Sequence, residues 1–210
     1  MAAQNYRDRL VDATLDLCTR YGYEAATVDQ IATAADLTPS DFACYFATKD
    51  AAVMSIVDDL LLASAVALRR VEVSASPEQA LLIATTEVLT AIIDGRGATT
   101  LSRMLVMGQI VVANPSLKKQ ASAARKRVLT QALADRMGVG ADNRRVRRAV
   151  TMWSAIAAGA YLGRRSMAAH YDPRQDDRLL ERMIDELTGT FADVMGETPH
   201  RRTEPPRTES

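Results

Sequence analysis

The sequence predicts an all-α fold whose amino-terminal part holds a helix-turn-helix. Apolar residues recur at intervals of three and four along most of the 210 residues, which is the spacing of one helical face. Only seven prolines and ten glycines occur, and several of them stand at the edges of these segments, where helices begin and end. Hydrophobic residues make up 48% of the chain and aromatic residues only 5%, so the expected core is aliphatic. The length allows one or two domains with a sizeable core.

The stretch 27–49 carries start signals for three successive helices. Thr27 is followed three residues later by Gln30, which predicts a capping box, where each side chain bonds to the backbone amide of the other residue. Thr38 repeats the signal, with Pro39 at the first helical position. Two helices of about two turns each cannot fold alone. The most common unit of this kind presents its second helix to the major groove of DNA.

Periodicity and chain breaks predict nine helical segments, which are residues 6–21, 28–35, 39–45, 49–71, 77–93, 99–113, 116–137, 143–169 and 175–195. Gly22 is suited to end the first as a left-handed cap, and Pro77 starts the fifth. Asn114 and Pro115 separate the sixth from the seventh, which ends at Gly138. The apolar stripe of the first segment is expected to comprise Leu10, Ala13, Leu17 and Tyr21.

The sequence offers no constellation of residues for catalysis, and no enzyme activity, metal site or cofactor is expected. Cys18 and Cys44 form neither a disulfide framework nor a metal-binding spacing, so both are expected to be small core or half-buried thiols. The sequence contains no run of about 18 uncharged apolar residues, and the amino terminus has no apolar signal region. We therefore expect a cytoplasmic protein that does not enter a membrane.

Charge alone does not favour nucleic-acid binding. The 26 basic and 26 acidic residues give a formal net charge of zero, whereas nucleic-acid binders are usually basic. Residues 1–70 hold six Lys or Arg against ten Asp or Glu, so the helix-turn-helix region is acidic. Any contact with DNA must therefore depend on where individual residues lie.

Residues 10–54 resemble the amino-terminal domain of the TetR family of bacterial transcriptional regulators. The matching features, in order, are LVDATLDLCTRYGYEAATV from residue 10, the IA at 31–32, the AxLT turn at 35–38, the YF at 45–46 and the TKD at 48–50. The resemblance implies an all-helical DNA-binding homodimer with a ligand pocket in its carboxyl-terminal domain. It also implies a repressor that binds a palindromic operator and is released by a ligand.

The resemblance also implies a domain organisation. Residues 1–50 would form the DNA-binding domain, and residues 51–196 the ligand-binding and dimerisation domain. Residues 197–210 are polar and contain proline, so this tail is expected to be disordered.

Candidate DNA-binding residues follow from matching the family motif and from the expected exposed face of the second helix of the motif. They are Thr27, Thr38, Pro39, Ser40, Asp41, Cys44, Tyr45 and Lys49. Lys49 matches a phosphate-binding lysine of the family, aided by the amino end of the helix that it begins. Asp41 could accept a hydrogen bond from cytosine, repel phosphate or simply cap its helix.

The sequence departs from the family at several of these positions. Most members have Gly where Asp36 stands, Gly-Thr at Ser40–Asp41 and Tyr at Ala43. The recognition helix has no Arg, Lys, Asn or Gln for bidentate base reading. The alternative hypothesis is therefore a dimeric small-molecule-binding protein whose helix-turn-helix has lost DNA binding.

The predicted ligand site depends on an apolar stripe and on a second, composition-driven resemblance. The carboxyl-terminal half contains RMLVMGQIVVANPSLKKQ from residue 103, ARKRVLTQALADRMG from residue 124 and RRVRRAVTMWSAIAAGA from residue 144. With these stretches it resembles regulators of the mycofactocin-system type, which implies an apolar effector of the acyl-CoA type. The candidate residues are Arg103, Met104, Met107, Ile110, Val111, Trp153, Ile156 and Tyr161. A stripe of this kind is also typical of plain core.

Residues 143–169 and 175–195 are the expected dimer helices, because the family pairs its last two helices across a four-helix bundle. The first of them carries small residues that allow close approach of another helix, namely Ala155, Ala157, Ala158, Gly159, Ala160 and Gly163. Tight packing inside one subunit is the alternative.

Overall fold

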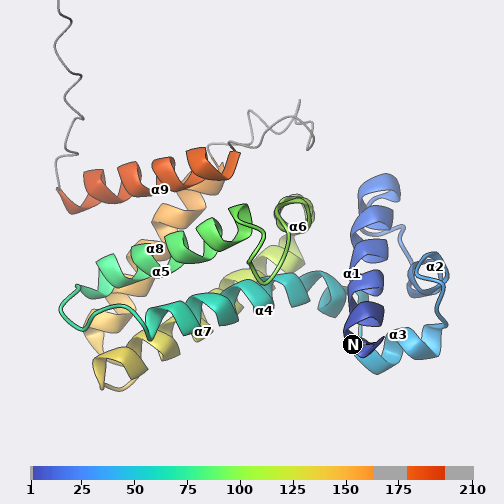
Figure 1. Ribbon diagram of the computed structural model, residues 1–210, viewed down its shortest axis with the longest axis horizontal. Helices are drawn as coiled ribbons and strands as arrows, with labels where there is room; N and C mark the ends of the chain where they lie inside the picture. Colours follow the sequence, from blue (N-terminus) through green and yellow to red (C-terminus); the bar gives the residue numbers. More distant parts are fainter. Residues whose placement is uncertain (1, 163–178, 197–210) are drawn as a thin grey trace, which may run out of the picture. The chain divides into compact units, whose positions relative to one another are not determined.

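The computed structural model describes residues 2–162 and 179–196, and within these ranges the regular structure is entirely α-helical (Figure 1). The described ranges contain nine helices, which are α1 (Ala2–Tyr21), α2 (Val28–Ala34), α3 (Pro39–Tyr45), α4 (Lys49–Leu68), α5 (Pro77–Ile93), α6 (Leu101–Ala113), α7 (Pro115–Met137), α8 (Arg144–Leu162) and α9 (Leu179–Met195). The predicted all-α fold is confirmed. The predicted tail, and the parts of the last two predicted segments at 163–169 and 175–178, lie outside the described residues.

The chain divides into two compact units, Met1–Thr151 and Met152–Ser210, with the boundary inside α8. The predicted boundary at residue 50 concerns function rather than compactness and stays a prediction.

Each short helix of the motif begins at the threonine that the sequence indicated. Thr27 accepts a hydrogen bond from the Gln30 amide while the Gln30 side chain accepts one from the Thr27 amide. Thr38 forms the same capping box, with Asp41 as its partner. Thr48 caps α4 by accepting from the Ala51 amide. These local bonds satisfy amides that a helix start leaves unpaired.

The turn between α2 and α3 depends on a left-handed residue. Asp36 has a φ of +49°. The Leu37 amide donates to the Ala32 carbonyl at 2.9 Å, and the Asp36 amide donates to the Thr33 carbonyl at 3.0 Å. This is the Schellman end of a helix, for which glycine is the usual residue. The family's glycine at this position therefore has a conformational reason, and aspartate is among the side chains that tolerate it best.

The buried face of α1 differs from the predicted stripe at its carboxyl end. Leu10 and Ala13 are buried as expected, but Leu17 is only half-buried and Tyr21 is 63% exposed. The face instead continues through Val11, Thr14, Leu15 and Cys18. Tyr21 is the last residue of α1, immediately before Gly22 ends the helix, and the core does not cover its ring.

Helix α4 forms the centre of the larger unit. It packs most extensively against α7 and α5, and it also contacts α1 and α6. Ten of its twenty residues are buried. The stretch Pro39–Leu68 is long and apolar enough by composition to cross a membrane, but 56% of its most apolar window is buried inside the structure. These side chains therefore serve the core.

Arg136, near the end of α7, holds the loop that follows α4. Its Nε donates to the Val71 carbonyl at 3.4 Å, and its Nη2 donates to the carbonyls of Glu72 and of Ala75, the latter at 3.1 Å. Gly138 then ends α7 in the left-handed conformation, with a φ of +63°. The carboxyl end of α4 is thus tied to the carboxyl end of α7.

In the smaller unit, α9 has one strongly apolar face. Leu180, Met183, Leu187 and Phe191 recur at helical spacing and are all buried. In the part of α8 that belongs to this unit, Ala157 is buried and Ala155 is exposed. The predicted dimer role of these helices stays a prediction.

Candidate nucleic-acid interface

The exposed face of α3 is the candidate reading surface. Phe42 is buried and packs against the Phe46 ring, with 5.7 Å between the ring centroids. This contact leaves the opposite side of the short helix exposed. Four residues form that side, Pro39, Ser40, Ala43 and Cys44. Three of them belong to the predicted site, and the fourth is the position where the family's tyrosine is missing.

Asp41 is held by Thr38 at the start of α3. Its Oδ2 accepts from the Thr38 amide at 2.8 Å and from the Thr38 hydroxyl at 2.7 Å. These two hydrogen bonds lower the pKa of the Asp41 carboxyl. Asp41 therefore caps α3 through Oδ2. If Asp41 also contacted a base, it would have to accept that hydrogen bond through Oδ1.

Lys49 is engaged by the loop between α1 and α2. Its Nζ donates to the Ala26 carbonyl at 2.7 Å and to the Tyr23 carbonyl, and it lies 4.2 Å from the centroid of the Tyr23 ring. An ammonium group has three N–H donors, so one remains for another partner. The family role of this lysine toward phosphate stays a prediction.

Tyr23, which the sequence did not mark as a site residue, belongs to a cluster with Lys49, Asp50 and Gln120 that reaches α7. Its hydroxyl donates to Asp50 Oδ1, and Gln120 Nε2 donates to Asp50 Oδ2 at 3.0 Å. Burial, followed by the bond to Asp50, raises the pKa of Tyr23, and that bond is the main cause that lowers the pKa of Asp50. The cluster fixes the loop before α2 and the start of α4 on α7.

The basic side chains described between residues 5 and 50 all have partners. Arg7 Nη2 is 2.9 Å from Asp59, Arg9 Nη2 is 2.9 Å from Asp36, and Arg20 Nε is 2.8 Å from Asp16. Lys49 is held as described above. Contacts to phosphate from this region would therefore fall mainly to neutral donors, which are backbone amides, threonine and serine hydroxyls and the Tyr45 hydroxyl.

The predicted ligand residues are mostly buried. This holds for Met104, Met107, Ile110, Val111, Trp153 and Ile156. The structure does not describe the side chain of Tyr161, the remaining predicted apolar residue. Burial is compatible with both core and pocket, so the apolar ligand site stays a prediction.

Arg103 lies at the start of α6 and pairs with helix α1. Its Nε is 2.6 Å from Asp12 Oδ1, and its Nη1 is 3.1 Å from Asp8 Oδ1. The hydrogen bond to Asp12 is the main cause that raises the pKa of the Arg103 guanidinium. The structure thus gives Arg103 two carboxylate partners from its own chain, and a ligand would have to compete with them.

Comparison with known proteins agrees with the motif. Residues 10–53 match the family model described as bacterial regulatory proteins, tetR family. The resemblance seen in the amino-terminal motifs is therefore confirmed over this segment. No curated protein matches the chain significantly by sequence.

Solved transcriptional regulators share the fold. SmeT, the repressor of the Stenotrophomonas maltophilia multidrug efflux pump SmeDEF, is 18% identical, with a TM-score of 0.57 over 89% of each chain. FadR from Bacillus halodurans, a fatty acid degradation regulator, is 15% identical, with a TM-score of 0.58 over 93% of this chain and 97% of that chain. FadR from Thermus thermophilus, a TetR family repressor in complex with lauroyl-CoA, is 18% identical, with a TM-score of 0.52 over 95% and 98%. The predicted TetR-like fold is confirmed.

Proposed function

We propose that the protein is a cytoplasmic DNA-binding transcriptional repressor that acts as a homodimer on a palindromic operator and is released by an apolar small molecule. The observation that carries the proposal is a complete helix-turn-helix within the segment that matches the family. Its second helix, α3, buries Phe42 and leaves Ser40, Ala43 and Cys44 exposed for the major groove. In such a dimer the two copies of α3 would lie roughly 34–36 Å apart, one turn of DNA.

The expected mode of binding relies on neutral donors. The Thr38 hydroxyl donates to Asp41 within its capping box, whereas the Thr27 hydroxyl only accepts in its own box and can still donate to phosphate. The amides at these helix starts and the Ser40 and Tyr45 hydroxyls can also face phosphate. Each neutralised phosphate contributes about −0.9 to the slope of log K against log salt. Because Arg7, Arg9 and Arg20 are ion-paired within the chain, we expect a shallower slope than that of strongly basic DNA-binding domains.

A gel shift against the gene's own upstream region tests the proposal, with Ser40→Glu as the variant. The added carboxylates would face phosphates in both subunits, each costing about 1 kcal/mol, so binding should weaken roughly thirty-fold. Ser122→Glu places the same change on an exposed residue of α7 and should leave binding unchanged. Wild-type protein that does not shift the upstream fragment at low salt would contradict the proposal.

Two further measurements test the dimer and the effector. Light scattering at micromolar concentration should give the mass of two chains, since α8 and α9 are expected to pair across a four-helix bundle. Acyl-CoAs are the first candidate effectors, because the Thermus thermophilus protein was solved with lauroyl-CoA. They should raise the unfolding temperature in proportion to the logarithm of their concentration above the dissociation constant.

A second candidate function is a dimeric small-molecule-binding protein without DNA binding. The ion pairs of Arg7, Arg9 and Arg20 favour it, because these three arginines offer little free positive charge. A dimer that is stabilised by acyl-CoA, but does not shift its upstream DNA or calf-thymus DNA at low salt, would establish this alternative.

A further inference from the structure

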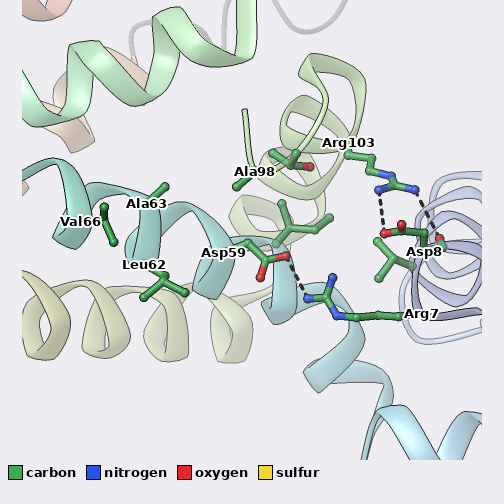
Figure 2. Close-up of a pocket in the computed structure, with 11 residues that line it drawn as sticks. Arg7, Asp8, Asp59, Leu62, Ala63, Val66, Ala98 and Arg103 are labelled. Atoms are coloured by element: carbon green, nitrogen blue, oxygen red, sulfur yellow. Dashed lines mark hydrogen bonds and ion pairs between the residues drawn. The ribbon is translucent and has the colours of Figure 1, made fainter. Parts of the chain in front are cut away.

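A cavity of about 480 Å³ that is partly open to solvent lies where α1, α4 and the start of α6 meet, all within the unit Met1–Thr151. Its apolar wall is formed by Val11, Ile56, Leu62, Ala63, Val66 and Ala98. In Figure 2, Leu62, Ala63 and Val66 follow one another along α4, and Arg7 and Arg103 border the space. Cavities of this volume accept small organic molecules. Of the residues predicted to bind a ligand, only Arg103 lines this one.

The charged residues of the cavity are already paired with one another. Arg7 from α1 meets Asp59 from α4 at 2.9 Å, and Arg103 from α6 meets Asp8 from α1 at 3.1 Å (Figure 2). A charged ligand would have to displace one partner and leave it short of its counter-ion in a partly buried place. An uncharged ligand leaves both pairs intact.

One polar group of the wall has no partner. Thr99 lines the cavity and is only 8% exposed, and its Oγ1 makes no hydrogen bond. Among the described side chains it is the single buried oxygen or nitrogen in this state. A buried hydroxyl without a partner costs free energy, and because Oγ1 itself is covered in the unliganded chain, a ligand oxygen recovers that free energy only when the Thr99 side chain turns toward the cavity.

We propose that this cavity binds an uncharged, mainly apolar molecule that carries one hydrogen-bonding oxygen, such as a medium-chain alcohol or ketone. The alkyl part lies against the valine, isoleucine, leucine and alanine side chains of α1, α4 and the loop before α6. The oxygen bonds to the Thr99 hydroxyl after this side chain turns toward the cavity. The site lies beside the ion pairs that tie α1 to α4 and α6. The role of the bound molecule as an effector rests on the proposed function, whereas its binding does not.

The test uses the full chain without DNA, so that a failure to bind DNA does not affect its outcome. Isothermal titration with 1-octanol, octanoate and octylamine compares one chain length with three head groups. We expect saturable binding of octanol, and binding at least about ten-fold weaker for the two charged compounds, because each would break an ion pair.

Two pairs of variants locate the site. Thr99→Val removes the hydroxyl at nearly constant shape and should weaken octanol about five-fold, whereas Thr90→Val, on an exposed face of α5, should not change it. Ala63→Leu places a larger side chain in the cavity and should abolish binding, whereas Ala113→Leu, at the exposed end of α6, should not. Thr99→Ser keeps the hydroxyl and should retain binding, which separates loss of the bond from a disturbed fold.

The proposal is overturned by either of two results. The first is the absence of saturable octanol binding to the wild-type chain. The second is octanol binding that neither Thr99→Val nor Ala63→Leu weakens, because the molecule would then bind elsewhere. Octanoate or octylamine binding as tightly as octanol would overturn the assigned ligand class.

Discussion

Replacing Lys49 tests whether this lysine acts on the fold or on DNA. In the structure its ammonium donates to the carbonyls of Tyr23 and Ala26 and lies over the Tyr23 ring. Lys49→Met keeps most of the aliphatic stem but removes both charge-assisted bonds. Each such bond contributes about 1.5 kcal/mol at the lower end of the usual range, which suits a half-buried residue. Water can hydrogen-bond to the two carbonyls in the variant and recovers part of this free energy. We therefore expect Lys49→Met to lower the free energy of unfolding by about 2 kcal/mol.

Urea unfolding followed by circular dichroism measures this loss. With a slope of about 2 kcal/mol/M, the midpoint should fall by about 1 M. Lys118→Met is the matched control, because Lys118 is an exposed residue of α7, and its midpoint should stay within error of the wild type. Lys49→Arg should recover part of the loss, since a guanidinium can still donate to carbonyls.

The same variants are then titrated with the upstream DNA over a range of salt. A lysine that neutralised one phosphate per subunit would contribute about two units of salt slope in a dimer. Because its bonds to the Tyr23 and Ala26 carbonyls hold the ammonium on its own chain and not on a phosphate, we expect Lys49→Met to change the slope by less than about one unit. An unchanged urea midpoint combined with a slope lowered by about two units would refute this reasoning and assign Lys49 to phosphate alone.

Three other predictions concern α1, α4 and the loop before α6. Thr99→Val should raise the free energy of unfolding by about 1 kcal/mol relative to the control Thr90→Val, because it replaces a buried hydroxyl that has no hydrogen-bond partner with a methyl group. A urea midpoint equal to or below that of Thr90→Val would contradict this. Arg103→Met should cost about 1 kcal/mol after solvent screening, less at high salt, and should speed amide hydrogen exchange in α1, which loses two ion pairs; unchanged exchange in α1 would count against it. The pKa of Asp50 is lowered in the folded chain, so its contribution is present above the unfolded pKa near 4 and is lost as the pH falls through the folded value. Asp50→Asn should therefore flatten the acid limb of stability against pH below about 4, and a limb as steep as the wild type's would show that other carboxyls dominate.

Local signals in the sequence predicted the helix starts well. Thr27, Thr38 and Thr48 cap their helices through bonds to residues three positions away, so a short window of sequence contains both partners. The exposed face of α3 was also expected from the sequence, and Pro39, Ser40 and Cys44 are exposed on it. The family's glycine at the position of Asp36 also acquired a reason, because that residue has a positive φ.

Partners that are distant in sequence could not be predicted. Arg103 was assigned to a ligand because it stands among apolar residues, but its acidic partners lie 91 and 95 positions away on α1. Lys49 bonds to carbonyls 23 and 26 positions earlier, which no side-chain pattern marks. The cavity beside Thr99 arises from three segments whose packing only the fold determines. Composition could describe the apolar surface there but not the empty space.

The anchor at Arg136 has a mechanical consequence for α4. Because Arg136 fastens the loop after α4 to the end of α7, and Gln120 of α7 bonds to Asp50 at the start of α4, the two helices would shift together, and a rotation about the end near Arg136 would carry both. The 20 residues of α4 make a lever about 30 Å long. A rotation of about 4° would then move the opposite end, where Thr48 follows α3, by roughly 2 Å. In a dimer both copies of α4 would rotate, so a small rotation near Arg136 would change the distance between the two copies of α3 by up to about twice that displacement.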